Sequence, residues 1–184
     1  MRKLFILFIL ILPILAFAQS DQTWNVGLKI GPLFPGTVNI GAAEVDTETG
    51  FIFDGSIDAM VTPKLSMGAC LLYASTSAED FNADATVITF GGTLKARFDM
   101  ENDMQVRTGG YIGYQMSEVD VPGSKDSQGL GLGALVELVY PLQNGGALVG
   151  ELSFLSQPAG GNADDDVTWA PIFFLAFGYE FGGK

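Results

Sequence analysis

The sequence of 184 residues contains no histidine and only one cysteine. Without imidazole, the chain cannot build a Ser-His-Asp or Cys-His catalytic arrangement, or a metal site that requires a histidine ligand. The single cysteine, Cys70, cannot form a disulfide within the chain, and we expect its small side chain to be buried. No catalytic, cofactor-binding or metal-binding residues are therefore assigned, and we do not expect an enzyme.

The chain is also poor in charge. Charged residues make up 16% of it, against about 25% in ordinary soluble domains, whereas 48% of the residues are hydrophobic. A surface facing water would be unusually short of charge, so we expect another environment to cover much of it. The charges are mainly acidic, with 21 Asp and Glu against 9 Lys and Arg. Because phosphate binding depends on clusters of Lys and Arg, this balance argues against a nucleic-acid partner.

Long apolar runs are absent from the chain except at its beginning. There, the basic pair Arg2-Lys3 precedes the apolar stretch 4–15 and the small-residue site Ala16-Phe17-Ala18, which is the pattern of a cleaved secretory signal peptide. The stretch is shorter than the roughly 20 residues of a membrane-spanning helix. We therefore expect residues 1–18 to be a signal peptide and residues 19–184 to form one mature domain.

The mature chain alternates apolar residues with small or polar ones, and clusters of Gly, Pro, Asn and Asp interrupt the alternation. This period of two is the signature of β-strands. In the final segment, aromatic and aliphatic residues alternate with Ala176, Gly178 and Glu180, although Ile172 and Phe174 break the pattern. Eight strands are predicted, at about residues 23–33, 50–61, 65–75, 86–98, 104–117, 128–140, 146–155 and 167–181.

The predicted connections between the strands alternate in length. This asymmetry and the even strand number are typical of outer-membrane barrels, which have short periplasmic turns and longer external loops. A chain without a spanning helix can satisfy its backbone groups in lipid only as a closed barrel. The predicted fold is an all-β, eight-stranded, antiparallel, up-and-down transmembrane β-barrel. Its short turns are 62–64, 99–103 and 141–145, and its long external loops are 34–49, 76–85, 118–127 and 156–166.

In each predicted strand one set of alternate positions carries apolar residues and the other set, which we call the polar parity, carries small or polar ones. The charged residues within the strands all fall on the polar parity, which we expect to face the lumen. An eight-stranded barrel is just wide enough for side chains to fill it, and unpaired buried charge is expensive. We therefore expect the inward charges to pair and to leave no continuous water pore. They are Lys29, Asp54, Asp58, Lys95, Arg97, Arg107, Glu137, Glu151 and Glu180. Glycines at 27, 31, 91, 109, 113, 129, 131, 133 and 178 would make room for them.

Aromatic residues cluster near both ends of the predicted strands, where they would form the two interfacial girdles of a membrane barrel. The periplasmic girdle would contain Trp24, Phe98, Tyr140, Tyr179 and Phe181. The external girdle would contain Phe51, Tyr73, Tyr114, Phe154 and Trp169.

With this pattern and its closing segment, residues 173–181, the chain resembles the small eight-stranded outer-membrane barrels of the kind of outer membrane proteins A and X. The segment looks like the aromatic-alternating final strand that the barrel-assembly machinery reads, although it continues through Gly182-Gly183-Lys184. The resemblance implies location in the outer membrane, contact with its lipids, and the assembly machinery as a partner during biogenesis. It also implies a structural or surface-interaction role, with specificity in the external loops.

Two other classes of protein fit parts of the pattern. A soluble exported barrel that binds an apolar ligand, as lipocalins do, would reverse the parities, with Gly131 facing water and Leu130 and Leu132 lining a pocket. The low charge content argues against it. An enzyme would need a site made of carboxylates alone, for which Asp54 and Asp58 share one strand face. Packing in the lumen explains these two residues better.

Acidic residues are frequent in the predicted loops. Their oxygens are ligands that Ca²⁺ and Mg²⁺ prefer, but the spacing matches no EF-hand loop, so we expect solvated acidic loops. An extracellular ligand or divalent cations stay open as partners of these loops. The residues are Glu44, Asp46, Glu48, Glu79, Asp80, Asp84 and Asp164-Asp165-Asp166.

Overall fold

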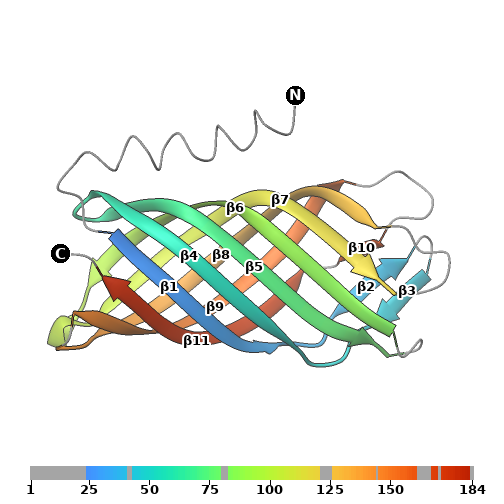
Figure 1. Cartoon of the computed structure of the whole chain (residues 1–184), viewed down its shortest axis with the longest axis horizontal. Helices are drawn as coiled ribbons and strands as arrows, with labels where there is room; N and C mark the ends of the chain where they lie inside the picture. Colours follow the sequence, from blue (N-terminus) through green and yellow to red (C-terminus); the bar gives the residue numbers. More distant parts are fainter. Residues whose placement is uncertain are drawn as a thin grey trace.

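A computed structural model of the chain shows a closed barrel of eight strands, with a separate three-stranded sheet at one end (Figure 1). Within the described residues, no helix is long and apolar enough to cross a membrane. The structure describes residues 24–40, 43–79, 83–120, 126–143, 145–160, 167–169 and 171–182, so the predicted signal peptide lies outside it.

Each barrel strand runs antiparallel to its neighbours, and the first and last strands pair to close the barrel. Closure leaves no sheet edge, as a barrel in lipid requires. The predicted eight-stranded, up-and-down fold is confirmed. Its strands are β1 (Trp24–Leu33), β4 (Gly50–Thr62), β5 (Leu65–Ala78), β6 (Ala83–Asp99), β7 (Gln105–Val119), β8 (Ser127–Pro141), β9 (Gly146–Gly160) and β11 (Ile172–Gly182). The short 3-10 turn η1 (Glu101–Asp103) joins β6 to β7.

Three short strands form the second sheet, which we call the cap sheet: β2 (Thr37–Ile40), β3 (Ala43–Asp46) and β10 (Val167–Trp169). They lie at the end of the barrel opposite to the end where β1 begins and β11 finishes (Figure 1). The prediction of one strand over 167–181 was wrong, because β10 belongs to the cap sheet and Pro171, which has no N–H for a ladder, precedes β11.

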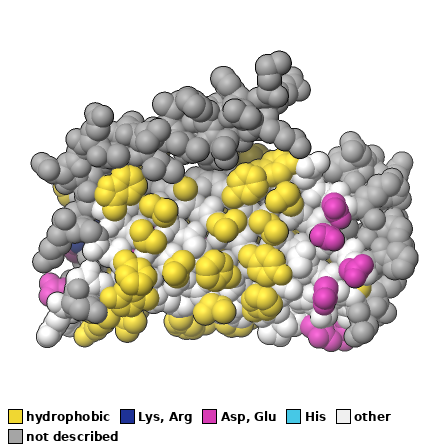
Figure 2. Space-filling view, in the orientation of Figure 1, with side chains coloured by type: hydrophobic (Ala, Val, Ile, Leu, Met, Phe, Trp, Pro, Cys, Tyr) yellow, Lys and Arg dark blue, Asp and Glu magenta, His cyan; other side chains and the backbone are white. Residues whose placement is uncertain are grey.

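The outer wall of the barrel is apolar. Leu28, Leu94 and Phe177 are each about half exposed, at 47%, 49% and 57%, and hydrophobic side chains cover the strands in Figure 2. Burial of apolar surface is favourable by about 25 cal/mol per Å², so such a wall suits hydrocarbon far better than water. The predicted parity is confirmed. The reversed parity of a lipocalin-like barrel is wrong, because Leu130 and Leu132 are exposed on the outside.

Aromatic side chains pair on this wall near both ends of the barrel. Phe51 and Tyr73 lie toward the cap sheet with ring centroids 5.8 Å apart, whereas Tyr179 and Phe181 lie at the other end with centroids 4.7 Å apart. These positions agree with the two predicted girdles. Trp169 was assigned wrongly, because in β10 it is only 4% exposed and belongs to the buried core.

The inside of the barrel has two layers. Toward the cap sheet many inward side chains are apolar, and Leu33, Ile52 and Phe174 are completely buried there, although Gln115 and Ser117 on β7 are buried polar residues of the same end. Toward the other end the inward side chains carry the charges described below. The expectation that the inner parity is small or polar throughout was therefore wrong for the first layer. Ile172 and Phe174 break the alternation in the sequence because they fill this apolar layer.

Close approach of neighbouring strands explains several of the inward glycines. A Cβ added at Gly31 would lie 1.9 Å from the carbonyl oxygen of Leu175, and one added at Gly178 would lie 1.9 Å from that of Leu28. Any side chain at these positions would push the strands apart. We predicted that these glycines make room for long side chains. In the structure, however, it is the backbone of the neighbouring strand that leaves no space for a Cβ at these two positions.

The first prediction tests which face of β6 meets lipid. We expect Leu94→Lys to impair folding into lipid vesicles, because a lysine near the bilayer midplane costs about 2–4 kcal/mol. We expect Thr93→Lys to be milder, because Thr93 faces the lumen and its hydroxyl donates to Asp58 Oδ1 at 2.6 Å. A lysine at this position would therefore have a carboxylate partner close by. The folded fraction in vesicles, measured by heat-dependent gel mobility, gives the comparison.

Thr93→Ser is the control for this pair, because it keeps the hydroxyl and changes the packing little. It should fold like the wild type. If Thr93→Lys proved more damaging than Leu94→Lys, the assignment of faces along β6 would be inverted.

Candidate functional site

The inward charges of the second layer form one buried network, which we call the lumen network. The predicted charges share the inner face of their strands because alternate residues point the same way. Arg97 stands apart at the turn end, where its side chain is 31% exposed and pairs with Asp99 at 2.9 Å. The other eight predicted charges are all buried: Lys29, Asp54, Asp58, Lys95, Arg107, Glu137, Glu151 and Glu180.

Lys29 occupies the middle of the first part of the network. Its Nζ lies 2.6 Å from Asp54 Oδ2 on the neighbouring strand β4. It also donates to Glu137 Oε1 on β8, at 2.8 Å, and to Glu151 Oε2 on β9. The Ser153 hydroxyl donates to the second oxygen of Glu151. One ammonium group thus contacts three carboxylates contributed by three different strands.

Lys95 forms the second part of the network from β6. Its Nζ donates to Asp58 Oδ2 at 2.8 Å and to Glu137 Oε1 at 2.9 Å. The second oxygen of Asp58 accepts the Thr93 hydroxyl at 2.6 Å. Both oxygens of Asp58 are therefore engaged, and Glu137 joins this lysine to Lys29.

Arg107 on β7 completes the network. Its guanidinium donates to both oxygens of Glu180, at 2.5 and 2.9 Å, which is the paired geometry that favours an arginine over a lysine. The same Arg107 Nη1 lies 3.7 Å from Glu137 Oε2. Glu137 therefore has ion-pair contacts with Lys29, Lys95 and Arg107, so it is the carboxylate on which the three cations converge.

Glycines stand directly opposite three members of the network. In the strand register Lys29 faces Gly178, Lys95 faces Gly109 and Asp58 faces Gly68. A Cβ on Gly68 would lie 2.4 Å from Asp58 Oδ1. Gly68 was not predicted from the sequence, and neither were the hydroxyls of Thr93 and Ser153. Each hydroxyl could have been found by its position two residues from a charge on the same strand face.

The chemistry that the network offers is that of packed ion pairs. Asp54 and Asp58, the pair considered for a carboxylate site, both point inward, and each contacts a lysine. Cys70 is buried, as predicted. In the described lumen, every one of these carboxylates thus has a cation within ion-pair distance.

The acidic loop residues behave differently from the acids of the lumen. Glu44, Asp46, Glu48, Glu79 and Asp84 are exposed, and acidic side chains gather mainly at the cap-sheet end in Figure 2. Within the described residues, no three His, Cys, Asp or Glu side chains come together as a metal site would require. The remaining predicted loop acids, Asp80 and 164–166, lie outside the described residues.

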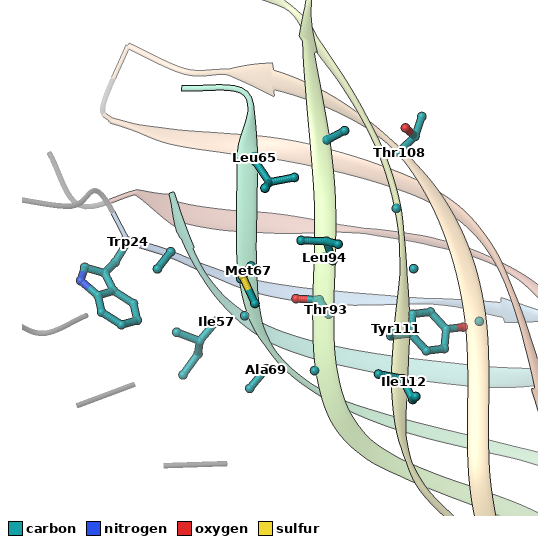
Figure 3. A pocket seen from close by; sticks show the side chains of 17 residues that line it. Trp24, Ile57, Leu65, Met67, Ala69, Thr93, Leu94, Thr108, Tyr111 and Ile112 are labelled. Carbon is teal, nitrogen blue, oxygen red and sulfur yellow. The ribbon is translucent and has the colours of Figure 1, made fainter. Parts of the chain in front are cut away.

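A groove of about 660 Å³ lies along β4 to β7 (Figure 3). Small residues such as Ala69 and Gly92 form part of its lining, beside the larger exposed side chains of Met67, Leu94 and Ile112. The groove is therefore a depression in the apolar outer wall, bordered by side chains that suit the hydrocarbon chains of surrounding lipid.

The family model of the outer membrane protein beta-barrel domain matches residues 4–181. The chain belongs to this family. The match covers nearly the whole sequence, so the protein is an integral barrel of the outer membrane, as the apolar wall and the charged lumen indicate. No curated protein matches the sequence.

Solved structures of outer-membrane barrels are similar to this one. Neisserial surface protein A has a TM-score of 0.63 at 15% identity, with 86% of this chain and 96% of that chain covered. A major outer membrane protein from Thermus thermophilus has a TM-score of 0.58 at 14% identity, covering 89% and 100%. Ail, the attachment invasion locus protein of Yersinia pestis, has a TM-score of 0.53 at 11% identity, covering 88% and 100%. At these identities, the likeness shows the shared fold.

The second prediction tests the position of Glu137 at the meeting point of the three cations. We expect Glu137→Gln to destabilise the folded barrel by about 1.5–3 kcal/mol, because Lys29, Lys95 and Arg107 each lose their ionic contact with this carboxylate. Urea unfolding in vesicles measures the change. Glu101→Gln, an equivalent change at an exposed residue of η1, should alter the stability little. Equal stability of both variants would show that Glu137 does not hold the network together.

Proposed function

We propose that this protein is a structural and surface-interaction barrel, with a closed lumen and a folded acidic platform at its external end. The observation that carries the proposal is the cap sheet. Its side chains Val38, Val45 and Trp169 are buried in the same apolar cluster as Leu33 and Phe174 of the barrel. Loops that pack into the barrel in this way form a platform instead of an open channel mouth.

The acidic charge of the external end indicates what kind of partner the platform would bind. The four long connections predicted from the sequence contain twelve acidic residues and a single lysine, Lys125. Fields from such clustered charges attract ligands of opposite sign over about one Debye length, roughly 8 Å at physiological salt. We propose that the platform binds a positively charged extracellular ligand such as a basic protein surface, while the wall contacts outer-membrane lipids. The barrel-assembly machinery is the proposed partner during insertion.

The names of two similar barrels agree with this role. One is called a surface protein and another an attachment invasion locus protein. A shared fold does not carry a function with it, so the proposal depends on the cap sheet and on the acidic charge of this chain.

The third prediction concerns conductance. The apolar layer below the cap sheet should block steady passage of ions, because its inward side chains Leu33, Ile52 and Phe174 are fully buried. Purified protein in planar bilayers should therefore show no long-lived openings. Stable, pore-sized current steps would contradict the closed lumen.

The fourth prediction tests the acidic platform on intact cells. Neutralising three exposed acids of β3 and its following turn, with Glu44→Gln, Asp46→Asn and Glu48→Gln, should weaken the salt-sensitive binding of a fluorescent lysine-rich peptide. The effect should be several-fold at low salt and should diminish as salt screens the charges. Cells that do not express the protein supply the baseline.

The matched control removes the same number of charges at the opposite end, with Asp99→Asn, Glu101→Gln and Asp103→Asn. All three residues are exposed at the η1 turn. This variant should bind the peptide like the wild type, because the predicted topology places the turn in the periplasm. Equal loss in both triple variants, or in neither, would count against an external acidic platform.

A further inference from the structure

The lumen network is unbalanced in charge. In the part of the lumen that the structure describes, five buried carboxylates face three cations, so two negative charges have no counterpart. The remaining described cations lie elsewhere: Arg97 pairs with Asp99, and Lys64 is exposed at a turn. A buried charge without compensation is costly. The imbalance therefore calls for added positive charge.

The contacts show where the excess negative charge lies. Glu137 contacts all three cations, Glu180 has the paired contact with Arg107, and Asp58 has Lys95 and the Thr93 hydroxyl. Asp54 and Glu151 are left with Lys29, which they must share with Glu137.

Asp54 also has an oxygen that nothing in the described structure satisfies. Its Oδ1 is buried and has no hydrogen-bond partner among the described residues, and the residue is 3% exposed. Glu137 Oε2 also has no hydrogen-bond partner there, but it lies 3.7 Å from Arg107 Nη1. A buried carboxylate oxygen without a hydrogen-bond partner is a second indication, independent of the charge count, that the Asp54 side chain does not carry a full, unneutralised negative charge.

The surroundings supply no further charge to this pair. The Tyr111 hydroxyl on β7 donates to the backbone carbonyl of Phe154, and the Cys70 thiol on β5 is buried nearby. Phenol and thiol groups are ordinarily neutral at neutral pH. In the strand register Asp54 lies between Lys29 on β1 and Leu72 on β5, and Glu151 lies between Glu137 on β8 and Ala176 on β11. The charged groups opposite the pair are thus Lys29 and Glu137.

We propose that Asp54 and Glu151 together hold at least one proton at neutral pH, so that the lumen is a proton-binding site. The proton comes from water and adds to a carboxylate oxygen, with no other bond made or broken. A metal ion would need space and several oxygens around it, but Lys29 Nζ already occupies the position between the carboxylates. A proton needs no such space.

Proton binding in the lumen has a measurable consequence for folding. In the unfolded chain both carboxyls face water and are ionised above about pH 5, so the folded state binds more protons than the unfolded state. Stability then falls as the pH rises, and the folding equilibrium constant decreases about tenfold per pH unit for each proton held. The decrease continues up to the pH at which the folded barrel releases the proton. Because the chain has no histidine, no other side chain of ordinary behaviour titrates between about pH 5.5 and 8.

The experiment is urea unfolding of the full mature chain in neutral vesicles between pH 5.5 and 8, for the wild type and for Asp54→Asn, Glu151→Gln and the double variant. We expect the folding constant of the wild type to fall about tenfold per pH unit over part of this range. The fall should be reduced in each single variant and abolished in the double variant. Glu101→Gln, at the exposed turn, should keep the wild-type slope. A flat wild-type profile, or an unchanged slope in the double variant, would overturn the proposal.

A second measurement needs only the wild-type protein, and it decides the question if a variant does not fold. Infrared spectroscopy distinguishes the carbonyl stretch of a protonated carboxyl from the carboxylate bands. At pH 7 the folded barrel should show a protonated band that shifts in heavy water. Absence of this band would overturn the proposal. So would a stability that depends on exchanging sodium for a bulky organic cation and not on pH, because a bound metal ion would then supply the charge.

Discussion

The pairing of β1 with β11 is the constraint on which the rest of this structure depends. In hydrocarbon, every backbone N–H and C=O must be bonded within the protein, and closing the sheet is how this chain achieves it. Closure with eight strands fixes a narrow interior. Every inward side chain must then pack against the opposite wall, so Lys29 on β1 reaches carboxylates on β8 and β9. The lumen network is a consequence of barrel size as much as of residue type.

The period of two along the chain was sufficient to predict the eight barrel strands and the face that most of their residues occupy. Lys29 and Glu137 lie inside, and Leu94 and Leu130 lie outside, because parity alone decides this once one face must be apolar. Residue type could not reveal which side chains pair with each other. Glu137 and Lys29 are separated by 108 positions in the chain, and their contact depends on register and curvature that no local pattern encodes.

The cap sheet could not be predicted for a related reason. β2 and β3 have four residues each and β10 has three, too few for alternation to be recognised. Their stability comes from burial of Val38, Val45 and Trp169 against the barrel, which is a tertiary interaction. The two breaks in the final strand, Ile172 and Phe174, were a sign of this apolar layer in the sequence, and so were Leu33 and Ile52, which also fall on the inner set of alternate positions. Ile172 and Phe174 occupy strand positions where small or polar residues were expected, because the lumen at that level is largely apolar.

The acidity of the chain has two separate physical meanings in this fold. Twelve acidic residues belong to the predicted loops, where water can solvate them and where their mutual repulsion costs little. Five others are buried in the lumen, where each must meet a cation or lose its charge. Glu137 meets three cations, whereas Asp54 and Glu151 share one. Net charge alone does not show how the carboxylates are divided between loop and lumen, and this division decides which of them water can solvate and which need a buried partner.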